Sequence, residues 1–189
     1  MLHLGIDASL TATGVCILEN GQPVAYEEFL IKKLRGTARL FENKRRLLDF
    51  MGSQKFDGIA IEGPSYDSIG RHVDIGELHG TIKLCLFEKG YENLLIPTPT
   101  QLKKYACGTA NIPSVTAKEI VLRSIALEFG LDTPTLTHNT ADALVLAKIC
   151  YDFQREALPR SAARQAVIKA LKKPPKKKPL RKKNYASSL

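Results

Sequence analysis

Apolar positions follow a strand-like pattern over the first 31 residues. Three short, mostly apolar runs occupy residues 2–8, 13–19 and 23–31, and polar turn residues separate them. The Asn20-Gly21 pair between the second and third runs is the strongest short-range signal of a β-hairpin. The pattern therefore predicts that the chain begins with three antiparallel strands.

Helical spacing dominates much of the region that follows. Apolar residues recur there every three or four positions, as they do on the buried face of a helix. The predicted helices span residues 37–51, 75–86, 116–129 and 139–156. The third of them opens with a Thr116-x-x-Glu119 capping box, a signal for a helix start.

Two further apolar runs, residues 57–62 and 93–97, predict buried strands. Residues 99–115 are rich in turn-forming types and predict a loop that contains one brief helical turn at 101–105. Strands that alternate with helices in this order predict an α/β fold. We expect a mixed five-stranded sheet, with its first three strands antiparallel, flanked by helices.

The composition changes after Leu158. No acidic residue follows Glu156, whereas 11 of the 28 Lys and Arg residues lie between Arg160 and Lys183. Such a Lys/Arg/Pro-rich segment buries too little apolar surface to offset its ordering entropy, although residues 162–171 have weak helical potential. We therefore expect a folded domain at 1–158 and a disordered basic tail at 159–189.

The net charge of +9 indicates a polyanionic partner, but the charge is unevenly distributed. Residues 1–158 hold 17 basic and 19 acidic residues, so a folded domain with those bounds is slightly acidic. Binding of a nucleic acid would then depend on a local basic patch of the domain. The general attraction to phosphates would come mainly from the tail.

Targeting and cysteine patterns favour an intracellular protein. The longest apolar stretches are far shorter than the roughly 20 residues that span a bilayer, and no secretory signal precedes the first strand. The four cysteines are widely spaced, which is typical of reduced core thiols and not of a disulfide framework or a zinc site. We expect a cytoplasmic protein that is neither membrane-bound nor secreted.

Three acidic residues carry the candidate chemistry. Asp7 ends the first strand, Glu62 ends the strand predicted to lie parallel to it, and Asp142 lies in the first turn of the last helix. Each alone also fits a bland role, such as a strand-end turn, a solvated position or a complement to the helix dipole. Together they would repel one another unless a cation neutralised them.

A cluster of oxygen ligands favours Mg²⁺, or Mn²⁺ as its substitute, over zinc. Two such ions in one site activate a water and stabilise the leaving oxygen in phosphodiester hydrolysis. The three carboxylates therefore predict a metal-dependent nuclease that holds two ions in its active site.

Four segments together resemble a known family. The segments GIDASLTATGVCIL, IAIEGP, Pro99-x-Gln101-Leu102-Lys103 and Ala141-Asp142-Ala143-Leu144 resemble RuvC-type Holliday junction resolvases, in the same order, over roughly residues 1–155. The resemblance implies an RNase H-like fold, a homodimer, and Mg²⁺-dependent paired nicks in a four-way DNA junction. Small size and the basic tail are also compatible with a phage or viral member, acting in the cytoplasm of an infected host.

The chain departs from the family pattern at one expected metal ligand. The family has Asp or His three positions before the helix aspartate, where this sequence has Asn139. Asn139 can offer a neutral oxygen to a metal or cap the helix. His138 is an alternative ligand or proton shuttle, and loss of activity is a third reading.

Several residues are candidate DNA contacts. The resemblance places Lys103 and Lys118 beside the scissile phosphate, and Lys104, Arg71 and Arg123 are further candidates for phosphate contacts, although surface bases are often only solvated. Tyr66, which follows Glu62 after a short interval, is either a base-stacking residue worth roughly 1–3 kcal/mol or a loop packing residue.

Two other function classes stay open. A catalytically weak or silent protein that binds branched DNA fits Asn139 and the basic tail. A phosphotransferase of the actin, heat-shock chaperone and sugar-kinase class shares an early Asp7 followed by Thr13-Gly14, but it needs a second half and Gly-rich loops that this sequence lacks. An RNA-processing relative of RuvC is a further reading among the nucleases.

Overall fold

The computed structural model describes residues 1–64 and 71–173. In this part of the chain the strands are β1 (Leu2–Asp7), β2 (Ala12–Glu19), β3 (Gln22–Leu30) and β4 (Gly58–Ile61). The helices are α1 (Gly36–Met51), α2 (His72–Glu88), α3 (Pro99–Cys107), α4 (Ser114–Phe129), the short 3₁₀ helix η1 (Thr133–Thr135), α5 (His138–Gln154) and α6 (Ala162–Leu171). None of these helices is both long and apolar enough to cross a membrane.

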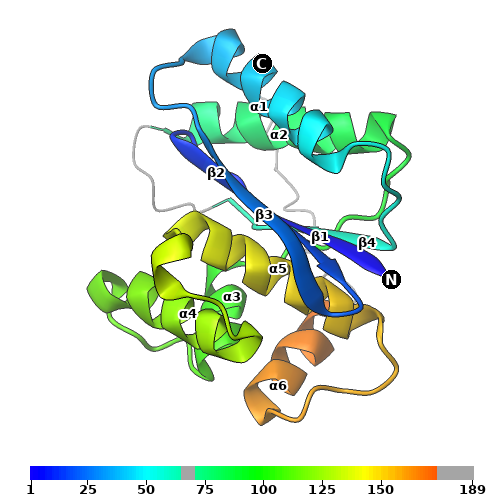
Figure 1. Ribbon diagram of the computed structural model, residues 1–189, viewed down its shortest axis with the longest axis vertical. Coiled ribbons are helices and arrows are strands. Elements are labelled where there is room, and N and C mark those ends of the chain that lie inside the picture. Colours follow the sequence, from blue (N-terminus) through cyan, green and yellow to red (C-terminus); the bar gives the residue numbers. More distant parts are fainter. Residues whose placement is uncertain (65–70, 174–189) are drawn as a thin grey trace, which may run out of the picture.

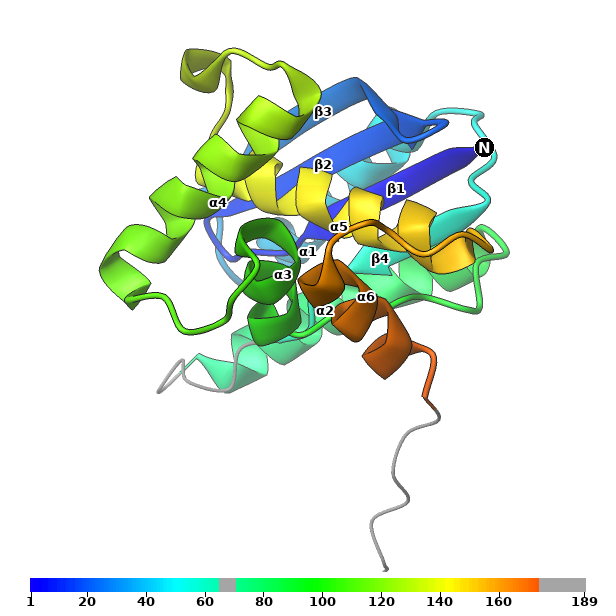
Figure 2. The same cartoon turned by 90° about the horizontal axis from the view of Figure 1, so that it is seen from below.

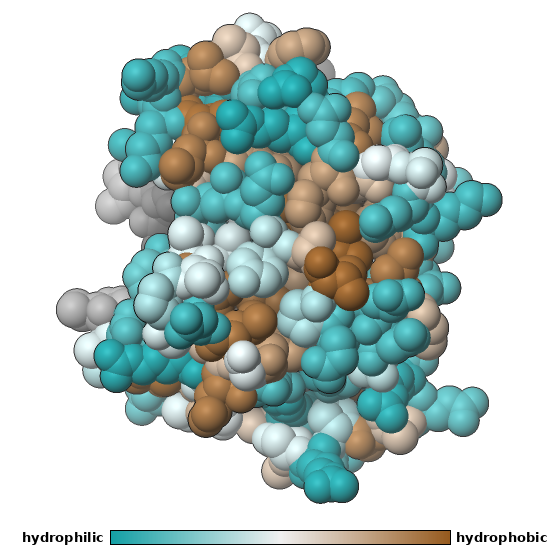
Figure 3. Space-filling view, viewed as in Figure 1, coloured by the Kyte–Doolittle hydropathy of each residue, from teal (hydrophilic) through white to brown (hydrophobic). Residues whose placement is uncertain are grey.

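The strands form a mixed sheet in the order β3-β2-β1-β4. β1 pairs with β2 and β2 with β3 in antiparallel fashion, whereas β4 lies parallel to β1. Asn20 and Gly21 both have positive φ, which is the geometry of a tight type I′ hairpin turn. The antiparallel part of the sheet ends at β3, which is an edge strand. The face of the molecule seen in Figure 3 carries mostly hydrophilic residues, with scattered hydrophobic ones.

The prediction of five strands is wrong, because the described residues contain a four-stranded sheet. The segment expected as the fifth strand runs beside β4, and its Leu95 exchanges backbone hydrogen bonds with Ile59 and Ile61. Gly63 then donates to the carbonyl of Pro97. Between these bonds, a parallel ladder would need an N–H at residue 97, and proline has none. The pairing is therefore reduced to an isolated bridge between Ala60 and Leu95.

Helices cover both faces of the sheet. α1 and α2 lie on one face, and α5 crosses the other, where α3, α4 and α6 surround it (Figures 1 and 2). Side chains alternate along β1, so that Leu4 and Ile6 belong to the core under α1 and α2. Gly5 faces α5, and a Cβ there would lie 2.0 Å from the carbonyl oxygen of Ala143. The absence of a side chain therefore lets α5 lie directly against the central strand.

Two helix starts differ from the prediction. The segment expected as loop forms α3, whose first turn is held by reciprocal hydrogen bonds between Thr98 and Gln101. α4 begins before the expected capping box: Pro113 is its N-cap, and the Thr116 hydroxyl donates to the Pro113 carbonyl. Thr116 is thus inside the first turn, where its hydroxyl cannot serve as the cap.

The expected boundary after Leu158 is also wrong, because α6 is part of the folded domain. Val167 and Ile168 are buried in the same core as Leu102 of α3. Arg164 anchors the helix by donating to Glu128, at 2.7 Å from Nη1. The weak helical potential is sufficient here because tertiary packing provides most of a helix's stability.

Inclusion of α6 changes the charge of the folded region. Residues 1–173 contain 22 basic and 19 acidic residues, so this part of the chain is slightly basic and not slightly acidic. The end of the expected tail, residues 174–189, lies outside the described residues.

Candidate active site

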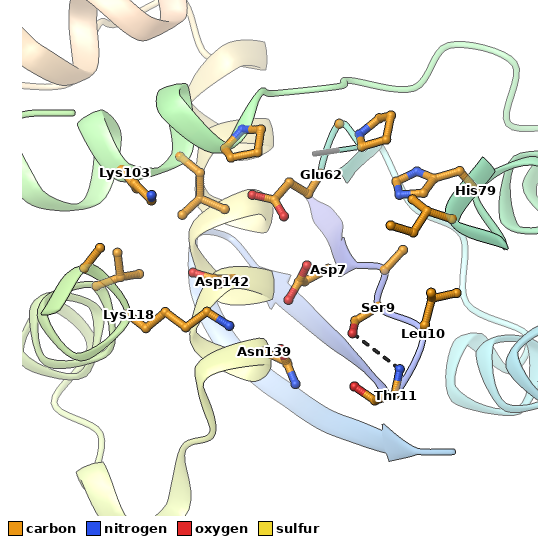
Figure 4. A pocket seen from close by; sticks show the side chains of 18 of the residues that line it. Asp7, Ser9, Leu10, Thr11, Glu62, His79, Lys103, Lys118, Asn139 and Asp142 are labelled. Atoms are coloured by element: carbon orange, nitrogen blue, oxygen red, sulfur yellow. Dashed lines mark hydrogen bonds between the residues drawn. The ribbon is translucent and has the colours of Figure 1, made fainter. Parts of the chain in front are cut away.

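The three acidic residues face one cavity of about 450 Å³ (Figure 4). Asp7 has the same orientation as Gly5 on β1, and Glu62 the same as Ala60 on β4, so the period of two directs both carboxyls toward α5. Asp142 comes from the first turns of α5 itself. The sequence-based prediction that these three carboxyls meet at one end of the sheet is thus matched by their positions around the cavity.

Close contact between α5 and the sheet fixes this arrangement. Gly14 on β2 lies under the N-terminal turn of α5, where a Cβ would be 2.1 Å from the carbonyl oxygen of Asn139. Together with the contact at Gly5, this places the start of α5 over the ends of β1 and β2. Asp142 is therefore positioned by backbone packing and not by the flexibility of a long side chain.

The pKa values of the three carboxyls are all raised. Burial raises the pKa of Asp142 to about 8, and the neighbouring Asp7 adds to the rise. Burial and then Asp142 raise the pKa of Glu62 to about 7. The pKa of Asp7 is well above its usual range, because the carboxyl is buried and because Glu62 lies beside it. Ionisation of all three carboxyls therefore needs more positive charge than Lys103 and Lys118 supply.

Basic side chains line the opposite wall of the cavity. Lys103 of α3 and Lys118 of α4 both line it, and their charges lower the pKa of Glu62 and of Asp142. In Figure 4 the Lys118 side chain extends toward the carboxyls. Arg71, at the start of α2, also lines the cavity. These three of the predicted DNA contacts therefore line the same cavity as the acids.

The other predicted contacts are placed differently. Lys104 and Arg123 do not line the cavity, and Arg123 forms an exposed ion pair with Glu119, with 2.8 Å between Nε and the carboxylate oxygen. Tyr66 lies outside the described residues, so its suggested stacking role stays a prediction.

Asn139 lines the cavity, whereas His138 is exposed and does not. The interpretation of Asn139 as the cap of the last helix is wrong. The N-cap of α5 is Thr137, which forms a capping box with Thr140. The Asn139 side chain instead donates from Nδ2 to Oε1 of Glu28, at 2.7 Å. Asn139 therefore lies at the same cavity as the three acids, and the carboxylate of Glu28, which was not predicted, lies beside it.

Sequence reasoning missed several other residues at this site. The loop after β1 lines the cavity through Ser9 and Thr11. Thr13 holds this loop by bonding to Ser9, and its hydroxyl donates to buried Asn43 of α1 at 2.8 Å. The Thr13-Gly14 motif was a sequence signal for this loop. No sequence signal indicated the contribution of Asn43, which lies 30 positions further along the chain.

His79 of α2 also lines the cavity. Burial lowers its pKa to about 4, so the ring is neutral at physiological pH, and its Nδ1 has no hydrogen-bond partner among the described residues. It supplies an uncharged wall next to the acids.

The donor chemistry of the site fits a hard divalent cation. The acidic side chains offer only oxygen ligands, which suit Mg²⁺ or Mn²⁺. Within residues 1–64 and 71–173, no three His, Cys, Asp or Glu side chains converge closely enough to enclose an ion by themselves. This is compatible with Mg²⁺, which usually takes one or two carboxylates together with water and substrate phosphate.

Comparisons with known proteins agree with the resemblance noted in the sequence. No protein-family model matches the chain. Crossover junction endodeoxyribonuclease RuvC of Bifidobacterium longum is 26% identical over 157 residues, which is 80% of this chain and 78% of the relative. The protein of the same name from Bifidobacterium longum subsp. infantis is 27% identical over 158 residues, with the same shares. These relatives confirm the resemblance to RuvC-type resolvases.

Solved structures of Thermus thermophilus RuvC are similar in fold. The protein alone gives a TM-score of 0.64 at 22% identity and covers 78% of this chain and 92% of that one. Its complex with a Holliday junction substrate gives 0.66 at 21% identity, with shares of 78% and 91%. The likeness shows an RNase H-like α/β fold for this chain.

Proposed function

We propose that this chain, as a relative of RuvC, is a structure-specific DNA endonuclease that resolves Holliday junctions. The observation that carries the proposal is the meeting of Asp7, Glu62 and Asp142 in one cavity whose other wall presents Lys103 and Lys118. Buried acids with raised pKa values need a positive charge nearby in order to ionise. Hydrolysis of a phosphodiester needs both cations and an activated water. One cavity here provides residues for both requirements.

The carboxyls would hold divalent metal, Mg²⁺ or Mn²⁺, with two ions per active site. When bound, the metal supplies an activated water and stabilises charge on the leaving oxygen. Asp7 lies next to both other acids, as its effects on their electrostatics show, and would hold the metal together with them.

The basic residues would position the DNA backbone. Lys118 lies within the first turns of α4, where backbone N–H groups also favour a phosphate. Lys103 reaches the same acids from α3, so the two amines lie on the same wall of the cavity. Such contacts hold the backbone in place without reading its sequence. Recognition of a branched structure then depends on the placement of two such sites.

A homodimer would provide the two sites. The outward face of α2 is apolar: Val73, Leu84 and Phe87 are 74%, 57% and 59% exposed. Gly76 and Gly80 lie between them, and nothing in the described part of the chain, apart from the backbone of α2 itself, would come within 4 Å of a Cβ at either position. A helix that is apolar on its outer face as well as its core face is typical of an interface. We therefore propose that α2 packs against α2 of a second copy.

One experiment tests the nuclease assignment. Asp7→Asn is compared with the wild type and with Glu92→Gln, which removes an exposed carboxylate outside the cavity. The substrates are four-way junctions, other branched DNAs, linear duplexes and RNA, each with Mg²⁺ or Mn²⁺. We expect the wild type and Glu92→Gln to nick the junction, and Asp7→Asn to bind it without cutting. Undiminished cutting by Asp7→Asn would refute the metal-site assignment.

The same assay addresses the second candidate function. An amide at position 139 in place of an acid favours a protein that binds branched DNA but cuts it weakly or not at all. Tight junction binding by the wild type without nicks in either metal would support that function in place of the first.

A further inference from the structure

Strand register brings a fourth acidic residue to the edge of the active site. Asp7 on β1 pairs with Gly14 on β2, and Gly14 pairs in turn with Glu28 on β3. Residues that are directly opposite in neighbouring strands point to the same face of a sheet. Glu28 therefore faces α5, as Asp7 does, two strands away from it.

The N-terminal turn of α5 bridges this row. Because Gly14 has no side chain, the backbone of Asn139 lies directly above it, between Asp7 and Glu28. The Asn139 amide spans the remaining distance, and its Nδ2 donates to Glu28 Oε1 at 2.7 Å. Figure 4 shows the amide nitrogen turned away from Asp7.

Glu28 determines which way the amide faces. An ionised carboxylate only accepts hydrogen bonds, so the group that meets it must be the NH₂ of Asn139 and not its oxygen. Since the two ends of an amide point in different directions, Oδ1 is left facing the cavity that Asn139 lines. A neutral oxygen in that place is a usable ligand for a hard divalent cation.

We propose that Glu28 is a positioning residue, which holds the Asn139 amide so that Oδ1 completes the metal site in place of a charged fourth ligand. The inference rests on the proposed nuclease function and assigns a role to a residue outside the cavity. Glu28 does not line the cavity, so it would orient Asn139 without touching the metal or the DNA. Its charge also raises the pKa of Asp7, so the test must separate orientation from charge. Outer residues that orient ligands in this way commonly matter 10- to 100-fold, as an order of magnitude, for metal affinity.

Direct Mn²⁺ binding tests the proposal without relying on activity. The free Mn²⁺ signal in electron paramagnetic resonance gives the affinity of wild-type protein, Glu28→Gln, Asn139→Ala and the double variant. We expect each single variant to lower the affinity roughly 10-fold. We expect the double variant to be no weaker than Asn139→Ala alone, because Glu28 has nothing left to orient. Additive losses would overturn the proposal, since they would mean that Glu28 acts independently.

Glu27→Gln is the matched control. It removes the same charge from the neighbouring position of β3, whose side chain points to the opposite face of the sheet. We expect its Mn²⁺ affinity to equal that of the wild type. An equal loss in Glu27→Gln and Glu28→Gln would show a general charge effect and would refute orientation by Glu28. Circular dichroism of each variant verifies that the fold is retained.

A charge exchange separates orientation from charge more sharply. In Asn139→Asp the new carboxylate meets Glu28 with no donor between them. Adding Glu28→Gln to this variant provides an amide that donates to Asp and restores the wild-type net charge. We expect Glu28→Gln to lower Mn²⁺ affinity when residue 139 is Asn and to raise it when residue 139 is Asp. A decrease in both backgrounds would overturn the proposal.

The outcomes also distinguish this inference from the proposed function. If the wild type neither binds Mn²⁺ nor nicks junctions, the proposed function fails and so does the inference that depends on it. If the wild type does both and Glu28→Gln leaves Mn²⁺ affinity unchanged, only the role of Glu28 is refuted.

Discussion

Truncation of Ile168 to alanine tests whether α6 belongs to the folded domain. The Ile168 side chain is fully buried, at 0% exposure, in the core that includes Leu102 and Tyr105 of α3. The substitution removes three carbon atoms from this contact and leaves the rest of α6 able to form. Arg164, which joins α6 to Glu128, is untouched.

The expected loss follows from the buried carbon atoms. Three of them are worth about 2.4 kcal/mol at ~0.8 kcal/mol each, and the cavity they leave adds to this, within the ~2–5 kcal/mol typical of Ile→Ala. α6 lies at the edge of the core and can settle inward, so we expect the lower half of that range, about 2.5–3 kcal/mol. For a chain of this size, that corresponds to a decrease in Tm of roughly 5–12 °C.

Urea unfolding and thermal unfolding monitored by circular dichroism measure the change. Lys169→Ala, at an exposed neighbouring position of the same helix, is the control and should remain within about 0.5 kcal/mol of the wild type. If Ile168→Ala also remains within that limit, α6 does not contribute to the folded domain and our reasoning about the domain boundary is refuted.

Two other perturbations follow from the fold. A chain that ends at Lys173 keeps α6, so we expect its Tm to be unchanged. Its binding to a junction should be weaker and less dependent on salt, because six basic residues are lost. Fluorescence anisotropy across a salt series measures the affinity, and an unchanged salt dependence would contradict the prediction. Gly14→Ala forces a Cβ to 2.1 Å from the Asn139 carbonyl oxygen. We expect the free energy of unfolding in urea to fall by about 2–3 kcal/mol and Mn²⁺ binding to weaken. An unchanged unfolding midpoint would show that α5 shifts freely.

Features encoded by nearby residues were predictable from the sequence. The Asn20-Gly21 turn follows from the ability of its residues to adopt positive φ, which the structure shows at both. The positions of Asp7 and Glu62 follow from the two-residue period and from the parallel pairing of their strands. Asp142 could be added because helical spacing placed it in the first turns of the last helix. Each inference needed only a few neighbouring residues and one rule of chain geometry.

Features that depend on a distant surface were not predictable in the same way. The segment 162–171 is a weak helix by itself, and its folding depends on the apolar surface that α3 and α5 present to Val167 and Ile168. The fifth strand was overpredicted for the opposite reason: its composition suits a strand, but the missing N–H of Pro97 interrupts the ladder that it would have joined. In both cases the partner, and not the segment, decides the outcome.

Glu28 shows how one residue can hide part of a site from sequence reasoning. The hairpin pairs Glu19 with Gln22 and Leu18 with Pro23, and continuing that register would place Glu27 opposite Gly14. A β-bulge beside Pro23 shifts the pairing by one residue, so that Gly14 meets Glu28 instead. Because a shift of one residue exchanges the two faces of a strand, the bulge decides which of two adjacent glutamates faces α5 and Asn139. The proposed exchange of a charged ligand for an amide held by Glu28 therefore depends on a backbone irregularity far from the active site along β3.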